Sequence, residues 1–487
     1  MKKKLRGKLR NGRGQQQVRR RQLQQRRQLQ GQGQGQGKQQ PRQTSLAAKF
    51  DLGFRSPWAV TMAGGKAAVE RDIFVGIRGE RIAAVRPAQA TDSRLCKKFF
   101  AKNGMVLLPG LINAHTHLPM TLLRGLAEDL PLEAWLHDKI FPYEALMLSP
   151  ASVRLGTQLA ALECVRFGTT TVNDMYYFVA QECEVWDSVG LRGVFAQQFF
   201  ANPTPETLAL GADYEAEFWR LHRKYANHPR IRIGVAPHAV YTCDEKVLRQ
   251  AVSLAKKAGV PLQIHAAETE AEVSLSISRY GMRPVEYLHH LGFWSPQTVC
   301  VHGIHVTPQE IEMLRQSGAG VVYNPDSNAK LASGVARVPE MMALSIPVAL
   351  GTDGSVSKND LSLFSAMNVG AKLQKLFHQD PALVKAAEIL RMATWDGARA
   401  LGMADQIGSI EEGKLADLIW VDFQYPHLQP VNDVISHLVF SCQGLEVDTV
   451  VCHGRVLLKE KKWTTIDASD VFARVEAFRK RVKPKLT

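Results

Sequence analysis

The feature that most constrains how this chain can fold is a regular alternation of short apolar runs with longer helical patterns. Eight such runs lie at residues 105–108 leading into 111–114, 170–172, 193–196, 231–236, 261–264, 298–301, 320–323 and 347–350. Segments with helical periodicity, such as residues 151–166, 245–258 and 308–316, separate them. The alternation is typical of βα units around a parallel sheet, and eight units predict a (β/α)8 barrel of the TIM type.

Short β patterns flank this region on both sides. Residues 72–86 read as a hairpin that turns at 78–80, and residues 416–422 and 449–458 read as strands near the other end. We therefore predict one small β-sandwich domain formed from both ends of the chain. The predicted boundaries are 47–108 and 401–465 for this domain, 109–400 for the barrel and 466–487 for a C-terminal helix.

Residues 1–46 have a different composition from the rest of the chain. They hold 5 Lys, 9 Arg, 14 Gln and no acidic residue, whereas the remaining residues include 47 basic and 46 acidic ones. Almost all of the net charge of +15 therefore lies in this segment. No aromatic residue precedes Phe50, so we expect a disordered basic tail. Such a tail either holds nucleic acid or another anionic surface electrostatically or is a dispensable extension.

The rest of the composition narrows the class of protein. No apolar run reaches the roughly 18 residues needed to span a membrane, so an integral membrane protein is not expected. The 7 cysteines are scattered and form no CxxC pair, which predicts reduced thiols and a cytoplasmic protein. Neither a P-loop nor a GxSxG nucleophile elbow is present.

Polar side chains follow nearly every predicted barrel strand. In chain order these are His115 and His117, Asn173 and Asp174, Gln197 and Gln198, His238, His265 and Glu268, His302, Asn324 and Asp326, and Asp353. The carboxyl ends of the strands are where barrel enzymes build their active sites. The pattern therefore predicts an enzyme.

Four of these residues predict a metal site. His115 and His117 lie two residues apart, so a strand directs both imidazoles to the same face. His265 ends the fifth strand and Asp353 the eighth. Three imidazoles and one carboxylate suit one Zn2+ per subunit, with Fe2+ or Mn2+ as alternatives. A cation bound there would lower the pKa of a water ligand toward neutrality.

The neighbouring residues predict acid–base chemistry beside this metal. Glu268 lies three residues after His265, close enough to take a proton from water and pass it to a substrate. His302 can reach the same water or Asp353, which predicts an orienting or proton-relay role. His238 is assigned to substrate binding, since four metal ligands are already named.

The motifs resemble those of a known group of enzymes. The sequence Pro-Gly-Leu-Ile-Asn-Ala-His-Thr-His at 109–117 resembles the amidohydrolase superfamily. Residues 118–131, Glu144, and residues 236–242, 265–269, 324–334 and 351–353 look like the 5′-methylthioadenosine/S-adenosylhomocysteine deaminases, and 408–417 resembles the tail of these hydrolases. The resemblance covers about residues 50–460.

The resemblance implies a hydrolytic deamination, in which an adenosine-type nucleoside becomes its inosine analogue and ammonia. It places zinc ligands on His115, His117, His265 and Asp353, and substrate contacts on Glu144, His238 and Glu268. The role of Glu144, a carboxylate able to hold ribose hydroxyls, rests on the resemblance alone. A homo-oligomer is also implied.

One departure from this family bears on the substrate. The family often carries an Arg just after the third strand, where residues 194–200 here read Val-Phe-Ala-Gln-Gln-Phe-Phe. The carboxylate of S-adenosylhomocysteine needs a cationic partner, and Gln198 offers only a neutral hydrogen bond. This favours methylthioadenosine or adenosine, unless Arg154 or a partner subunit supplies the charge.

Two alternatives remain open. The same ligands serve a chlorohydrolase or a deaminase of a triazine, guanine or pterin. A nucleic-acid-binding protein acting through residues 1–46 would be a different class of function.

Overall fold

The computed structural model describes residues 48–201 and 214–485. Contacts divide the chain into residues 1–47 and the unit 48–487. The predicted basic tail therefore lies outside the described residues. Within the described part, no helix is both long and apolar enough to cross a membrane.

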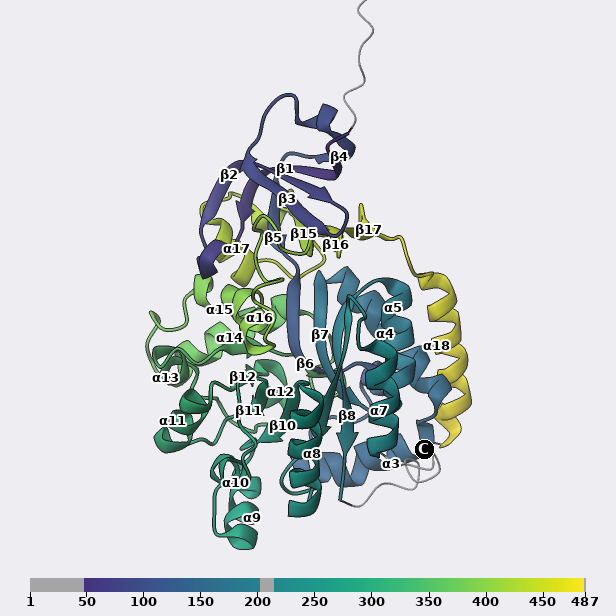
Figure 1. Cartoon of the computed structure of the whole chain (residues 1–487), viewed down its shortest axis with the longest axis vertical. Coiled ribbons are helices and arrows are strands. Elements are labelled where there is room, and N and C mark those ends of the chain that lie inside the picture. Colours follow the sequence, from purple (N-terminus) through teal and green to yellow (C-terminus); the bar gives the residue numbers. More distant parts are fainter. Residues whose placement is uncertain (1–47, 202–213, 486–487) are drawn as a thin grey trace, which may run out of the picture. The chain divides into compact units, whose positions relative to one another are not determined.

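The larger unit contains a closed parallel barrel (Figure 1). Its strands are β6 (Leu111–His117), β7 (Thr169–Tyr176), β8 (Arg192–Phe199), β9 (Ile231–Pro237), β10 (Leu262–Ala266), β11 (Thr298–His302), β12 (Gly320–Tyr323), β13 (Val348–Leu350) and β14 (Asp353–Gly354). β13 pairs with β12 and β14 pairs with β6, so together they act as the eighth strand and close the ring. The predicted (β/α)8 barrel is confirmed.

Helices cover the outside of the barrel. They include α4 (Pro150–Arg166), α5 (Val179–Val189), α7 (Tyr214–Tyr225), α8 (Glu245–Ala258), α9 (Glu270–Tyr280), α10 (Pro284–His290), α11 (Pro308–Ser317), α13 (Val338–Ala343), α14 (Leu363–Phe377), α15 (Ala386–Met392) and α16 (Trp395–Ala400). Local sequence sets where they begin: Thr307 and Glu310 form a capping box at α11, and the Asp244 side chain accepts from Val247 N at α8.

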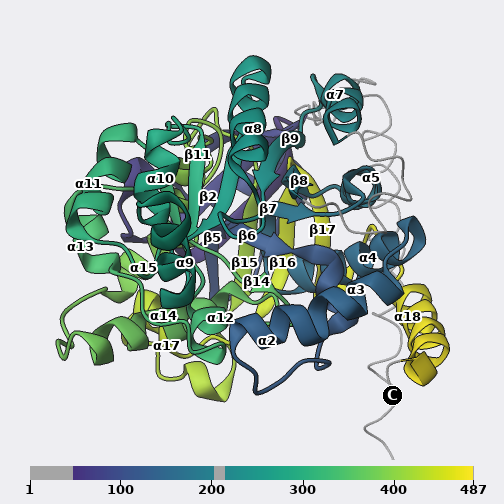
Figure 2. The same cartoon turned by 90° about the horizontal axis from the view of Figure 1, so that it is seen from below.

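The connection between β6 and β7 is long and folds over the carboxyl end of the barrel. It contains α2 (Leu132–Ala134), a π-helical turn η4 (Trp135–Ile140) and α3 (Phe141–Met147). Figure 2 views this end and shows α2, α3 and α12 (Pro325–Lys330) around the strand ends.

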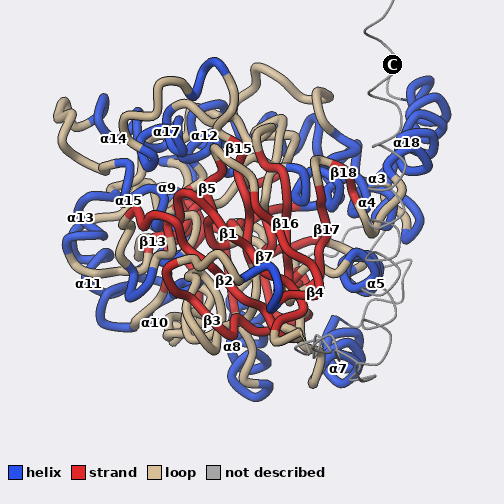
Figure 3. The backbone as a smooth tube through the Cα atoms, turned by 90° about the horizontal axis from the view of Figure 1, so that it is seen from above, coloured by secondary structure: helices blue, strands red, loops and turns tan. Residues whose placement is uncertain are grey.

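The small domain is one hydrogen-bonded sheet made from both ends of the described chain (Figure 3). Its strands are β1 (Phe50–Val60), β2 (Val69–Arg78), β3 (Arg81–Pro87), β4 (Cys96–Ala101), β5 (Met105–Pro109), β15 (Leu418–Asp422), β16 (Val447–Cys452), β17 (Arg455–Lys459) and β18 (Lys462–Trp463). β2 and β3 form the predicted hairpin, and β15 pairs antiparallel with β5. Phe54, Phe100 and Trp420 pack together in its core, with the two Phe rings stacked at 4.6 Å.

The first apolar run of the sequence is divided between the two parts. Residues 105–108 belong to the small sheet as β5, and the barrel begins at Leu111. Gly110 lies between them, where a Cβ atom would fall 2.2 Å from Thr170 Oγ1. Glycine therefore lets the chain pass against β7 as it enters the barrel. After the small sheet, α17 (Val434–Phe440) precedes β16, and the C-terminal α18 (Ala468–Val482) packs on α4.

A buried ion pair ties the small sheet to the barrel. Arg192, the first residue of β8, donates from Nε to Asp417 Oδ2 at 2.9 Å, and both residues are 4% exposed. The other Asp417 oxygen accepts from His453 N at 2.7 Å. Removing one partner would leave a buried charge without compensation.

We expect Asp417→Ala to lower the free energy of unfolding by about 3–5 kcal/mol, because Arg192 would remain buried and charged. The matched control is Glu217→Ala, which breaks the exposed pair with Arg220 and should cost about 0.5 kcal/mol or less. Urea unfolding midpoints of both variants measure the difference. Equal midpoints would show that the buried pair does not hold the two parts together.

Candidate active site

Three of the predicted metal ligands converge inside the barrel mouth. His115 and His117 project from β6 and His265 from β10, all three are buried, and their ligand atoms lie within 4.8 Å of one another. His115 Nε2 and His265 Nε2 are 3.2 Å apart. Asp353 Oδ1 lies 3.5 Å from His115 Nε2 and 3.2 Å from His117 Nε2. This set of three nitrogen donors and one oxygen donor fits a borderline divalent cation such as zinc.

Neighbouring groups orient these ligands. His117 Nδ1 donates to the Met175 carbonyl oxygen at 2.7 Å, which turns Nε2 toward Asp353. Asp353 Oδ2 accepts from the hydroxyls of Ser327 at 2.6 Å and Ser357 at 3.1 Å, so Oδ1 faces the imidazoles. Burial would raise the pKa of Asp353, but hydrogen bonds from the two imidazoles hold that pKa well below its ordinary value.

Glu268 lies beside this cluster and faces His302. The distance from Glu268 Oε2 to His302 Nε2 is 3.6 Å, and Ser333 Oγ donates to Glu268 Oε1 at 3.4 Å. Burial raises the pKa of Glu268 well above its ordinary value, and the carboxylates of Asp353 and Glu272 add to this shift. Glu268 is therefore suited to carry a proton at neutral pH.

The two further histidines of the pocket are held in place by side chains from later in the chain. Asn328 Nδ2 donates to His302 Nδ1 at 2.8 Å. His238 Nδ1 lies 2.9 Å from Thr242 Oγ1, and its ring stacks on that of Phe200 at 5.0 Å. Burial lowers the pKa of both His302 and His238 to about 3, so both imidazoles are neutral.

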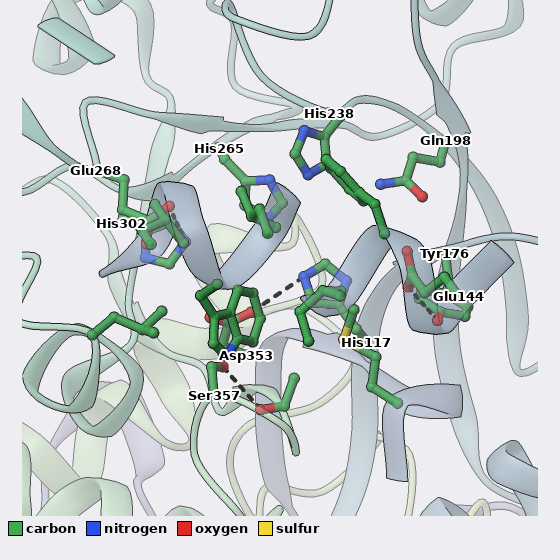
Figure 4. Close-up of a pocket in the computed structure, with 18 of the residues that line it drawn as sticks. His117, Glu144, Tyr176, Gln198, His238, His265, Glu268, His302, Asp353 and Ser357 are labelled. Carbon is green, nitrogen blue, oxygen red and sulfur yellow. Dashed lines mark hydrogen bonds and ion pairs between the residues drawn. The ribbon is translucent and has the colours of Figure 1, made fainter. Parts of the chain in front are cut away.

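The opposite side of the pocket carries a second carboxylate. Glu144, on α3, is buried and accepts a hydrogen bond from the Tyr176 hydroxyl. Figure 4 shows this pair across the pocket from Glu268 and His302, with Gln198 and His238 along a third side. The structure thus brings all of the predicted site residues around one cavity or into the metal cluster.

Between these polar groups the wall is apolar. The connection after β6 contributes most of it, and the apolar residues are Met120, Leu132, Trp135, Leu136, Ile140, Phe141, Phe200 and Leu331. Within the described residues, no Lys or Arg side chain lines this cavity. Arg154 pairs with Glu184 on the outer helices α4 and α5, so it does not supply the charge missing after β8.

Several residues that complete the site were not predicted from the sequence. Ser327 and Ser357 orient Asp353, Tyr176 bonds Glu144, and Gln263 Oε1 lies 3.4 Å from His115 Nδ1. Ser327 lies within the motif 324–334, which was the available signal. Nothing in the sequence pattern marks Gln263, which faces the barrel interior from the middle of β10.

A parallel barrel that gathers three histidines and an aspartate at the carboxyl ends of its strands defines a metal-dependent hydrolase. The family can be stated more closely. The model of the Amidohydrolase family matches residues 106–457, and the chain belongs to this family.

Several relatives are similar over most of their length. A 5-methylthioadenosine/S-adenosylhomocysteine deaminase of Syntrophobacter fumaroxidans is 44% identical over 414 residues, covering 84% of this chain and 93% of the relative. A 5′-deoxyadenosine deaminase of Methanothermobacter thermautotrophicus is 39% identical over 374 residues, covering 77% and 87%. The crystal structure of an adenosine deaminase from Xanthomonas campestris with bound zinc has a TM-score of 0.85 and 36% identity, covering 89% and 99%.

We expect the purified protein to hold one divalent metal ion per chain and His265→Ala to lower this content severalfold, because one of the four donors is lost. The matched control is His289→Ala, which removes an exposed imidazole on the outer helix α10 that is not part of the cluster. Elemental analysis by mass spectrometry after dialysis measures the content. Full metal content in His265→Ala would remove His265 from the ligand set.

Proposed function

We propose that this protein is a zinc-dependent hydrolytic deaminase that converts an adenosine-type nucleoside to its inosine analogue and ammonia. The observation that carries this proposal is the pocket with two functional ends. Glu268 and His302 stand beside the metal ligands at one end, and Glu144 with Tyr176 stands at the other. Relatives at 44% and 39% identity that are named as deaminases of adenosine derivatives support it.

The metal end of the pocket performs the bond-making chemistry. A zinc ion would be held by His115, His117, His265 and Asp353, and it would supply the Lewis acidity that makes a water nucleophilic at neutral pH. Two serines hold Asp353 Oδ2, so Oδ1 faces the metal cluster, where it would orient that water. Glu268 carries the proton that the purine ring nitrogen receives as C6 is attacked. His302, whose Nδ1 accepts from Asn328 Nδ2, stays neutral and orients the water.

The far end of the pocket holds the nucleoside. Glu144 accepts from the ribose hydroxyls while the Tyr176 hydroxyl fixes the position of its carboxylate. Gln198 and His238 contact the purine. Within the described residues, the buried Gln198 Oε1 has no hydrogen-bond partner, which suits an acceptor reserved for a substrate N–H group.

The preferred substrate carries a neutral 5′ group. The described part of the cavity offers apolar side chains and no Lys or Arg, whereas the amino-acid tail of S-adenosylhomocysteine bears a carboxylate that needs a cation. We therefore propose methylthioadenosine and adenosine as better substrates than S-adenosylhomocysteine.

Three associated expectations belong to this proposal. The 7 cysteines are free and 6 of them are buried, which supports a reducing compartment such as the cytoplasm. We also propose a homo-oligomer, as the family resemblance implies. Binding of nucleic acid would depend on residues 1–46, which lie outside the described residues.

Ammonia release by the zinc-loaded protein tests the proposal. We expect release from methylthioadenosine and adenosine, and a kcat/KM for S-adenosylhomocysteine at least about tenfold lower, because an unpaired buried charge costs more than 1.4 kcal/mol. Guanine and an aminotriazine serve as comparison substrates. Release from a comparison substrate and from no nucleoside would overturn the proposal.

Replacement of Glu268 tests its role separately. Glu268→Gln should retain the metal while kcat falls by about 10² or more, because the amide cannot transfer a proton. Glu270→Gln is the matched control, since the Glu270 side chain is 89% exposed and begins α9 nearby. Turnover of Glu268→Gln equal to that of the control would exclude Glu268 as the acid–base group.

A further inference from the structure

A second cavity lies at the opposite end of the barrel, where the strands begin. Its volume is about 610 Å3. The lining comes from the starts of β8 and β9, from the loops 226–230 and 258–261, from residues 400–403, and from Glu80, Arg81 and His453 of the small domain. The proposed deaminase mechanism does not use this cavity.

The cavity has an excess of positive side chains. Arg81, Arg192, Arg230 and Arg232 line it, and Glu80 is the one acidic residue among its described lining residues. Three of the guanidinium groups have protein partners. Arg192 pairs with Asp417, Arg230 pairs with Asp187, and Arg81 donates to the Gly413 carbonyl oxygen at 2.7 Å.

Arg232 is the exception. Within the described residues, its guanidinium makes no hydrogen bond and no ion pair, although the side chain is partly buried. Its neighbours Ile231 and Ile233 pack in the apolar core, so strand alternation directs Arg232 toward the barrel interior. Burial lowers the pKa of Arg232 and the nearby charge of Arg192 lowers it further, whereas the charge of Asp405, which makes no ion pair with it, raises it. An anion would compensate this charge.

The remaining lining residues indicate which chemical groups the ligand of this cavity would contain. Val194, Val299 and Met403 belong to one apolar cluster that contributes to the lining, and His222 and His228 also line the cavity. Several guanidinium groups around one space suit a phosphate, whose oxygens accept from more than one direction, better than a single carboxylate. The volume leaves room for an organic group beside it.

The cavity is separated from the metal cluster by a pair of amides. Asn173 and Gln263 line it, and Asn173 Nδ2 donates to Gln263 Oε1 at 2.9 Å. The same Gln263 oxygen lies 3.4 Å from His115 Nδ1. Gln263 thus lies between this cavity and a histidine of the metal cluster.

We propose that this cavity is a binding site for a phosphate-bearing small molecule and that Arg232 is its principal contact. This inference is independent of the proposed deaminase activity. A charge-assisted hydrogen bond from Arg232 to the ligand would give this partly buried guanidinium the partner that the described residues do not supply.

Calorimetric titration of the full-length, metal-loaded protein tests the site. The probes are inorganic phosphate, uridine 5′-monophosphate and uridine. Uridine is the control for uridine 5′-monophosphate, because it lacks only the phosphate. Neither compound is an adenosine-type nucleoside, so binding at the proposed active site is not expected. We expect at least one of the two phosphate probes to bind and uridine not to bind. Comparing the two phosphate probes distinguishes recognition of the anion alone from recognition of the organic group as well.

Two variants with the same change of charge assign the binding to the cavity. Arg232→Gln should weaken the binding about tenfold or more, whereas Arg223→Gln, on the exposed face of α7, should leave it unchanged. Arg232→Gln should also keep or raise the Tm, because it removes a partly buried charge that has no partner. Absence of binding by both phosphate probes, equal binding by the two variants, or a large loss of Tm in Arg232→Gln would overturn the proposal.

Discussion

The hydrogen-bonded seam between the eighth strand and the first is the interaction on which the site depends. Asn113 accepts from Thr352 N at 3.0 Å and donates to Thr352 Oγ1 at 2.7 Å, and Thr352 N also lies 3.1 Å from the His115 carbonyl oxygen. This seam closes the barrel and sets Asp353 beside Thr116 in register. The carboxylate therefore meets the two imidazoles of β6 as a direct result of barrel closure.

The convergence of the candidate metal ligands could be predicted because barrel topology determines where they must lie. Once His115, His117, His265 and Asp353 are placed at strand ends, parallel strands in a closed ring bring those ends to a common mouth. The spacing of residues along the chain then matters little, and 238 residues separate His115 from Asp353 without weakening the prediction. The prediction of this cluster required only the positions of the strands in the sequence.

Residues held by connections were less accessible to sequence reasoning. Glu144 lies between β6 and α4, and its role came from resemblance because no periodicity shows where a long connection folds back. Its partner Tyr176 ends a strand, but tyrosine at a strand end is common in packed cores. Likewise, an apolar run does not show which of two sheets its strand joins. The division of the first run into β5 and β6 occurs at Gly110, where the chain passes close to Thr170, a residue 60 positions later in the sequence.

The two ends of the barrel have opposite electrostatic character, and the neutral pair Asn173 and Gln263 stands between them. The carboxyl end concentrates Asp353, Glu268 and Glu144 around an apolar pocket, which suits a cation and an uncharged nucleoside. A phosphorylated nucleoside would lose its hydration against the apolar wall, and no Lys or Arg among the described lining residues would compensate its charge. The amino end offers guanidinium groups instead, and this difference in charge is the basis for proposing a neutral substrate at one end and an anionic ligand at the other.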